Sequence, residues 1–147
     1  MVVACEKVIF DQTGPFSLIS VFQRLHIQLQ EAPLPDKAIS PLRWHVFCLW
    51  EMERKEIGQT FTQIVRVYNT DGSLFFEGEG EFPSNEIDWS QVRINLRFGG
   101  VPIWAEGEIV VRVWLKGNET PVGEYKFAIK YIPKTDHLRT MQSVSEG

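Results

Sequence analysis

The chain has 147 residues, of which 44% are hydrophobic and 23% charged, and it carries a formal net charge of -4. This length favours one domain, and an acidic chain without a basic run is a poor match for nucleic acid. No apolar segment reaches the roughly 18–20 residues of a membrane-spanning helix, so we expect neither a nucleic-acid nor a membrane partner.

The first residues, Met1 to Lys7, resemble the start of a strand more than an export signal. They lack the basic start and the long apolar region that such a signal needs. Disulfides form in oxidising compartments, so Cys5 and Cys48 are expected to be reduced core residues. These features together predict a cytoplasmic protein.

Residues 1–10 and 16–29 are the first two predicted strands, joined by a turn over 11–14. Apolar and polar residues alternate from Phe16, and the alternation resumes with a different phase after Gln23. This phase change predicts a bulge or bend near Gln23. Part of the run also fits a helical period, but its β-branched residues and flanking turns favour a strand.

Residues 31–35 are expected to run extended, along an edge or between sheets, because prolines cannot donate to a ladder. Pro41 precedes the next predicted strand. One alternating set in that strand is uniformly apolar and should face the core: Trp44, Val46, Cys48, Trp50 and Met52.

The segment 61–82 is predicted to be a β-hairpin that turns at Asp71-Gly72, a strong short-range hairpin signal. A two-residue turn pairs Phe61 with Phe82, Arg66 with Glu77, Tyr68 with Phe75 and Asn69 with Leu74. This register gathers one apolar face: Phe61, Val65, Val67, Leu74, Phe76 and Phe82. We reject a three-residue turn, because a one-residue slip would send every side chain to the other face.

Gly78 and Gly80 fall on the apolar face of this hairpin and leave a trough there. Glycine within a strand often marks the close approach of another group. We expect an aromatic ring from the facing sheet to fill the trough, and the candidates are Trp44, Trp50 and Trp114.

Three more strands are predicted over 92–98, 108–115 and 125–131, after a polar connection over 83–89 and with an apolar linker over 101–105. The total of about eight strands with regular turn signals is typical of an all-β, antiparallel two-sheet sandwich. We assign residues 1–132 to this domain. Residues 133–147 show no periodicity and are expected to form a flexible C-terminal tail.

Several short motifs resemble those of an uncharacterised bacterial family: Ala4-Cys5-Glu6, Gly14 to Ile19, the Pro33/Pro35 pair, Asp71-Gly72 and Gly107. Members of that family are short, single-domain and immunoglobulin-like. The resemblance covers roughly residues 2–132 and rests on turns and core positions. It implies an immunoglobulin-like sandwich in a bacterial cytoplasm, and it implies no activity or site residue.

The sequence shows no catalytic or metal-binding pattern. His26, His45 and His137 are scattered, without the spacing of a metal site. Cys48 lies among apolar neighbours, which favours an inert thiol. Nucleophile-elbow and phosphate-loop motifs are missing. We therefore predict that the protein is not an enzyme and uses neither a cofactor nor a metal.

The function that these observations favour is a non-catalytic protein-binding module or assembly subunit, with another protein or a second copy as partner. Loops that display apolar residues are typical interface anchors, and two connecting segments carry them: Ile87, Trp89, Ile103 and Trp104. An equally good interpretation is that these segments fold back and cap the sandwich. The alternative function is a carbohydrate-binding module that stacks sugars on Trp89, Trp104 or Phe75.

Overall fold

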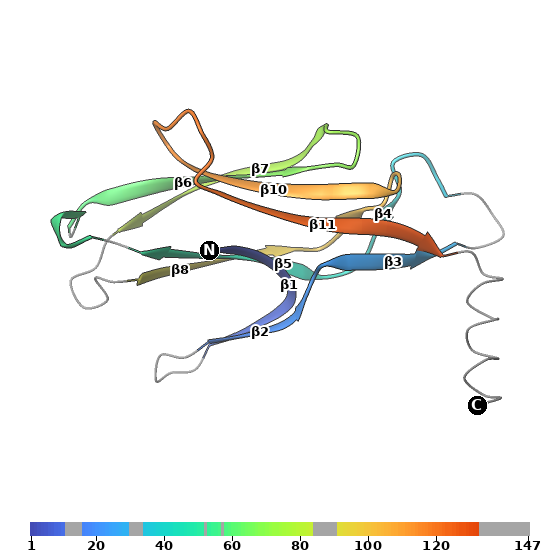
Figure 1. The fold of residues 1–147 in the computed structure, drawn as a ribbon, viewed down its shortest axis with the longest axis horizontal. Helices are drawn as coiled ribbons and strands as arrows, with labels where there is room; N and C mark the ends of the chain where they lie inside the picture. The colour runs from blue at the N-terminus through green and yellow to red at the C-terminus, as the bar shows by residue number, and fades with distance from the viewer. Residues whose placement is uncertain (11–15, 30–33, 52, 57, 84–90, 133–147) are drawn as a thin grey trace.

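The computed structural model describes residues 1–10, 16–29, 34–51, 53–56, 58–83 and 91–132 (Figure 1). These residues form β-strands and a single 3-10 turn, η1 (Arg54–Glu56), so the prediction of an all-β chain is confirmed. The predicted tail, 133–147, and most of the predicted polar connection lie outside the described residues.

The described part of the chain contains eleven strands rather than about eight. One predicted strand, 16–29, is divided in two, and two further two-residue strands occur, one in the predicted linker 101–105 and one at 39–40, which had no assignment. The strands are β1 (Val2–Phe10), β2 (Phe16–Val21), β3 (Arg24–Gln28), β4 (Ile39–Ser40), β5 (Trp44–Glu51), β6 (Thr60–Tyr68), β7 (Leu74–Pro83), β8 (Gln91–Phe98), β9 (Val101–Pro102), β10 (Gly107–Leu115) and β11 (Gly123–Ile132).

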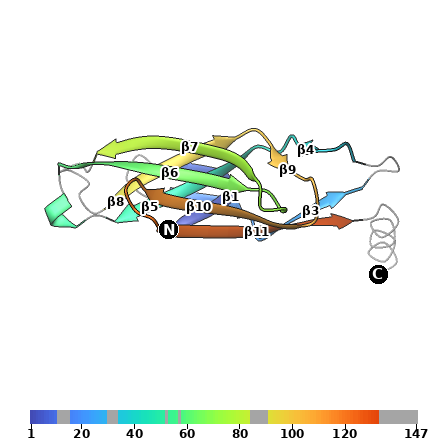
Figure 2. The ribbon, with the colours of Figure 1, turned by 90° about the horizontal axis from the view of Figure 1, so that it is seen from above.

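Two larger sheets lie one above the other in Figure 1, with strand orders β2-β1-β5-β8 and β3-β11-β10-β6-β7. Seen from above in Figure 2, β7, β6, β10 and β11 run side by side across the second sheet. The strands β4 and β9 pair with each other as a small third sheet.

The hydrophobic core lies between the two larger sheets. The first sheet supplies Ala4, Trp44, Val46 and Cys48, and the second supplies Val65, Val67, Ile109, Val111, Val113, Phe127 and Ile129. These residues alternate along their strands, so each strand turns one face inward, as the sequence pattern predicts. The outer face of the second sheet is polar instead, and there Arg66 Nε lies 3.2 Å from Glu77 Oε2.

The predicted break near Gln23 is confirmed, and it moves the chain from one sheet to the other. The strand β2 pairs antiparallel with β1, whereas β3 pairs parallel with β11. Between them, Phe22 is buried and its carbonyl accepts a hydrogen bond from the Tyr125 hydroxyl. Ser20 has a φ of 53° just before the crossing. The phase change in the sequence therefore marks a change of sheet as well as a bend.

The hairpin β6–β7 keeps the predicted register from Phe61–Phe82 to Val67–Phe76. Nearer the turn the register shifts, so Tyr68 pairs with Leu74, and the predicted pairs Tyr68–Phe75 and Asn69–Leu74 are wrong. The predicted inward position of Leu74 is wrong for the same reason, because this side chain is exposed.

A three-residue turn causes this shift. Asn69 N donates to Ser73 O at 2.8 Å, and Gly72 N donates to Asn69 O at 3.0 Å. Gly72 has a φ of 86°, the left-handed geometry of a turn that closes with a glycine bulge. The register then shifts between Val67 and Tyr68, where Phe75 is the extra residue of β7. The three-residue turn therefore does not invert the faces of the strands, and its rejection from sequence was wrong.

The trough at Gly78 and Gly80 exists, but the predicted filler is wrong. A methyl group built on Gly78 would lie 2.7 Å from Cζ of Phe76, two residues earlier on the same strand. The candidate rings are engaged elsewhere: Trp44 stacks on Phe98, Trp50 stacks on Phe82, and Trp114 lies under the Arg66 guanidinium. A built methyl group on Gly80 has no neighbour within 4 Å, so this half of the trough is open.

Candidate functional site

The four residues predicted to bind a partner have different positions. Ile103 is 6% exposed and belongs to the hydrophobic core, as the capping interpretation expects of it. Trp104, the next residue, is half-buried. Ile87 and Trp89 lie outside the described residues. Of the four, only Trp104 is therefore seen near the surface.

The surroundings of Trp104 do not make a free stacking platform. Lys37 Nζ lies 5.6 Å from the centre of the Trp104 ring, a cation–π distance. The indole N–H of Trp104 is buried and has no hydrogen-bond partner. A sugar on this ring would have to displace the lysine, so the ring offers little support for the carbohydrate-binding alternative.

A different surface gathers large exposed apolar side chains. Ile9 and Phe10 at the end of β1 are 45% and 48% exposed, and Ile19 and Val21 on β2 are 42% and 44% exposed. We call these four residues the hairpin patch. In Figure 1 this end of the β1–β2 hairpin bends away from β5 and projects below the first sheet. Solvent therefore reaches side chains that an ordinary sheet would cover.

The register of the hairpin places part of the patch on one face. Lys7 is opposite Ile19 and Ile9 is opposite Ser17, so Ile9 and Ile19 are diagonal neighbours. Phe10 pairs with Phe16 on the other face of the hairpin. The patch is therefore displayed on both faces of the projecting hairpin.

Aromatic contacts hold the hairpin in place. The ring centres of Phe16 and Phe47 are 4.7 Å apart, and those of Phe10 and Phe47 are 6.2 Å apart. Phe47 is fully buried, although it lies on the outer face of the first sheet. Arg93 covers the Phe16 ring at 5.1 Å. The hairpin is thus anchored on one side and leaves Ile9, Ile19 and Val21 to solvent.

The outer strand of this hairpin is also a free sheet edge. The strand β2 is the last in the order β2-β1-β5-β8, so among the described strands it pairs only with β1. An edge strand presents unpaired backbone N–H and C=O groups, which can pair with another chain. Two of the four patch residues, Ile19 and Val21, therefore lie on the strand that has the free edge.

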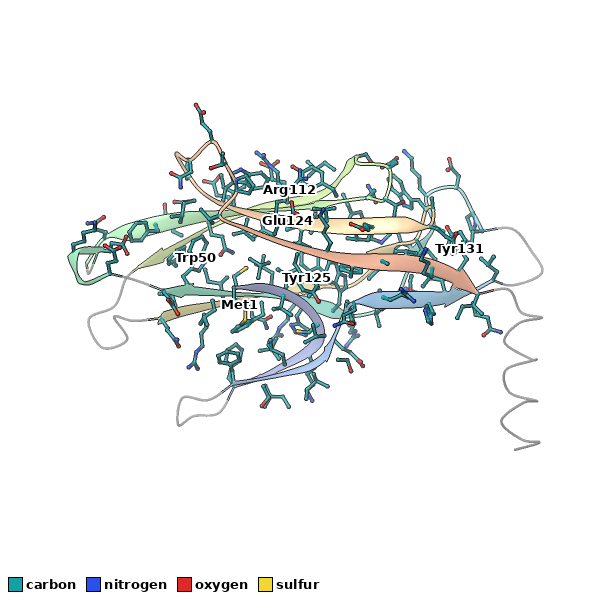
Figure 3. The ribbon with its side chains drawn as sticks, in the orientation of Figure 1. Met1, Trp50, Arg112, Glu124, Tyr125 and Tyr131 are labelled. Carbon is teal, nitrogen blue, oxygen red and sulfur yellow. The ribbon has the colours of Figure 1, made fainter. Side chains whose placement is uncertain are left out.

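A hollow of about 440 Å³ opens between the two sheets where Met1, Trp50 and Glu124 lie close together (Figure 3). Polar groups at its mouth are already paired. Met1 N donates to Leu49 O at 2.9 Å, and Glu124 Oε2 accepts from Arg112 Nε at 2.8 Å. The pKa of the Glu124 carboxyl is lowered, chiefly by this hydrogen bond from Arg112. We find no reacting group in this arrangement.

The two thiols have the properties of buried structural cysteines. Burial raises the pKa of Cys48 to about 12, and it also raises the pKa of Cys5. A thiol that stays protonated is a poor nucleophile and a poor metal ligand. Among the described residues there is no group of three or more His, Cys, Asp or Glu side chains placed to hold a metal ion.

Sequence reasoning missed the hairpin patch. The alternation in residues 1–10 and 16–22 predicted strands correctly, and an alternating strand was assumed to be covered on one face. A usable signal was present, because the apolar residues of 16–22 fall in both alternating sets, with Phe16 and Leu18 in one and Ile19 and Val21 in the other. A strand of this composition needs cover on both faces, and the fold covers only part of it.

No protein-family model matches the chain, and no curated protein matches it in sequence.

Within the described ranges, no helix has the length and apolar character that crossing a membrane requires.

Proposed function

We propose that the protein is a non-catalytic protein-binding module that binds its partner with the β1–β2 hairpin. The observation that carries this proposal is the hairpin patch, four large apolar side chains that are 42–48% exposed beside a free sheet edge. Large apolar residues that are exposed together on one element are typical of interaction sites. Aromatic and large aliphatic residues are common anchors of such interfaces.

The proposed mode of binding is strand addition to β2. An extended segment of the partner pairs its backbone with the free edge, which gives affinity, while its alternate side chains give specificity. Ile19 and Val21 lie on the edge strand itself, so the partner's apolar side chains would pack on them. Phe10 and Ile9 would extend the contact onto β1.

The strand order supports an immunoglobulin-like sandwich, which we propose as the fold class. Consecutive strands change sheets at β5 to β6, β7 to β8 and β8 to β10, the connection pattern of a Greek key. Three antiparallel strands, β1, β5 and β8, then oppose β7, β6, β10 and β11. In this scheme β3 adds in parallel to β11, and β2 is an extra edge strand. The resemblance to an uncharacterised bacterial family of this fold class is part of the same proposal.

We also propose that the protein acts in the cytoplasm. Both cysteines are free, and the β1–β5 register places them on opposite faces of the sheet, because Cys5 pairs with His45 whereas Cys48 pairs with Val2. They cannot bridge each other without a change of fold. Buried cysteines that stay as free thiols are typical of proteins in a reducing compartment.

The test compares wild-type protein with Ile19→Glu and with Gln28→Glu as a matched control. Both changes place one negative charge at an exposed position of an edge strand. Ile19 lies in the hairpin patch on β2, whereas Gln28 lies on β3, the edge strand of the other sheet. Each of the three proteins is immobilised and exposed to an extract of the native cell. A partner protein that the wild type retains is then purified, and its affinity for each of the three is measured by titration. The same variants are compared in sedimentation experiments in case the partner is a second copy.

We expect Ile19→Glu to raise the Kd by at least about tenfold, or ~1.4 kcal/mol, while Gln28→Glu leaves it unchanged. Equal affinity of Ile19→Glu and wild-type protein for the purified partner would show that the patch is not the binding surface. Circular dichroism of both variants checks that neither change unfolds the protein.

A further inference from the structure

The open edge between the two larger sheets, opposite the hairpin patch, carries a gap framed by aromatic rings. The core face of β7 contains Phe76, Gly78, Gly80 and Phe82 in succession. Phe76 packs edge-on against Phe98 of β8, with ring centres 4.9 Å apart. Phe82 stacks on Trp50 of β5 at 5.4 Å. These two contacts join the sheets at either end of the gap, and the two glycines lie between them.

The gap is a hollow of about 220 Å³ with an apolar lining. Its walls are formed by Val65, Phe76, Ile94 and Leu96, together with Gln63, Gly78, Glu79 and Gly80. The Phe76 ring covers Gly78, whereas Gly80 has open space around it. Glu79 is held by Lys116, whose Nζ lies 3.0 Å from Glu79 Oε1. Glu79 alternates with the two inward glycines, so its carboxylate lies on the outer face, and the hollow presents apolar walls and the Gln63 amide.

One polar side chain is built into this apolar wall. Gln63 is only 4% exposed, on a strand whose neighbouring inward residues, Phe61 and Val65, are apolar. Its Oε1 accepts a hydrogen bond of 2.5 Å from the indole N–H of Trp50. Because an indole nitrogen is only a donor, this contact fixes which end of the amide is oxygen.

The orientation of Gln63 leaves its Nε2 amide group as a donor at the hollow. No hydrogen bond from Nε2 is found in the described part of the chain. This nitrogen is not among the buried polar atoms that lack a partner, so solvent reaches it, and an acceptor on a ligand would replace water there. A hollow of this size also has room for a single ring, since an apolar cavity of about 150 Å³ binds benzene.

We infer that this hollow is a binding site for a small uncharged ligand with one aromatic ring and one carbonyl acceptor. The ring occupies the space above Gly80, between the Phe76 and Phe82 contacts, and packs on Ile94 and Leu96. The carbonyl oxygen accepts from Gln63 Nε2. A charged ligand is disfavoured, because the walls would desolvate it without offering a free counter-charge. This site is independent of the proposed protein-binding function, which uses the other edge.

The experiment titrates benzamide into protein with isotope-labelled methyl groups and follows the NMR signals of Val65, Ile94 and Leu96. Toluene, a single ring without an acceptor, is the ligand control. Gly80→Val places a side chain in the hollow, at a position where a built Cβ meets nothing within 4 Å. Gly99→Ala is the protein control, because Gly99 also has open space but lies outside this hollow.

We expect benzamide to shift these methyl signals in the wild-type protein and in Gly99→Ala, and to bind at least about tenfold more weakly to Gly80→Val. Gln63→Glu keeps the acceptor for Trp50 but removes the amide donor, so it should weaken benzamide binding while changing toluene binding much less. The inference is overturned if wild-type protein gives no saturable shift of these methyl groups, or if Gly80→Val binds benzamide as tightly as Gly99→Ala does.

Discussion

Two hairpins of this molecule, β6–β7 and β1–β2, have similarly alternating sequences and different surroundings. The β6–β7 hairpin lies in a five-stranded sheet, with Val65 and Val67 fully buried and Arg66 paired with Glu77 on the outer face. The β1–β2 hairpin is buried only at its base, around Ala4 and Cys5, and displays its far end to solvent.

The difference shows what an alternating pattern can and cannot predict. Alternation gives the strand and the set of residues that share a face, because side chains in a strand point to opposite sides. Whether a face is covered depends on the partner sheet, and that contact is made by residues distant in sequence. Here β5 and β8 of the facing sheet contact the inner face of the β6–β7 hairpin, through Trp50 on Phe82 and Phe98 on Phe76. The end of β1, in contrast, extends past its pairing with β5, which stops at Cys5.

The largest predicted effect is a difference in stability between two variants, each of which removes an aromatic ring from one hairpin. Phe82→Ala should lower the free energy of unfolding by about 3–5 kcal/mol, because Phe82 is 5% exposed and stacks on Trp50 and Phe61. Phe10→Ala should lower it by only about 1 kcal/mol, since half of that ring is already in water. Urea unfolding of both variants measures the difference. Equal losses would show that the two hairpins are equally covered.

A smaller difference in stability is expected between alanine substitutions at two glycines of the β6–β7 hairpin. Gly72→Ala should destabilise the protein by about 1–2 kcal/mol, because Gly72 has a φ of 86° and an L-residue is strained there. A built methyl group on Gly72 meets nothing within 4 Å, so the loss would come from the backbone alone.

Gly80→Ala is the matched control for this turn variant. Gly80 has the same open space around it but lies within a strand, where alanine is better tolerated than glycine. We expect its stability to equal or slightly exceed that of wild-type protein in the same urea titration. A loss as large as that of Gly72→Ala would contradict the strained-turn explanation.

The smallest predicted effect concerns pH and the same turn. The pKa of Asp71 is lowered, chiefly by the hydrogen bond from the Ser73 hydroxyl and also by the Ser73 backbone N–H at 2.9 Å. A lowered folded-state pKa stabilises the protein above the ordinary Asp pKa, and this stabilisation is lost as pH falls through the folded value. Asp71→Ala should therefore show a slightly shallower loss of stability on acidification.

Ser73→Ala is the control for the origin of this pH effect. It removes the hydroxyl donor and keeps the backbone N–H, so its acid dependence should fall between those of wild-type protein and Asp71→Ala. Thermal melting from neutral to acidic pH measures all three. Identical curves for the three proteins would show that the turn contacts do not hold Asp71 in its charged form.

Much of the fold could be predicted because its signals are local. The pairing of Arg66 with Glu77 and the break near Gln23 follow from neighbouring residues. The register shift at Phe75 could not be predicted, because a two-residue turn and a three-residue turn followed by this shift give the same pairs up to Val67. The filling of the trough by Phe76 depends on one side-chain rotamer, which the sequence does not fix.

The candidate site was less predictable than the fold. The sequence analysis selected apolar residues of two connecting segments as binding residues. One of them, Ile103, belongs to the core, and the exposed apolar residues of the hairpin patch lie on strands β1 and β2. Gln63 could have been noticed, because the predicted register places this polar residue on an apolar face between Phe61 and Val65. Buried polar groups of this kind need a partner, and they often mark a specific contact.

The most direct test of the contrast between the two hairpins is native-state amide hydrogen exchange of the free protein. The amides of Val8, Phe10 and Leu18 should exchange roughly a hundredfold faster than those of Val65, Val67 and Val111, because a poorly covered hairpin opens without global unfolding. Equal protection at both sets of amides would mean that the end of the β1–β2 hairpin is as firmly held as the core, and it would contradict the proposal that this hairpin is a free surface for a partner.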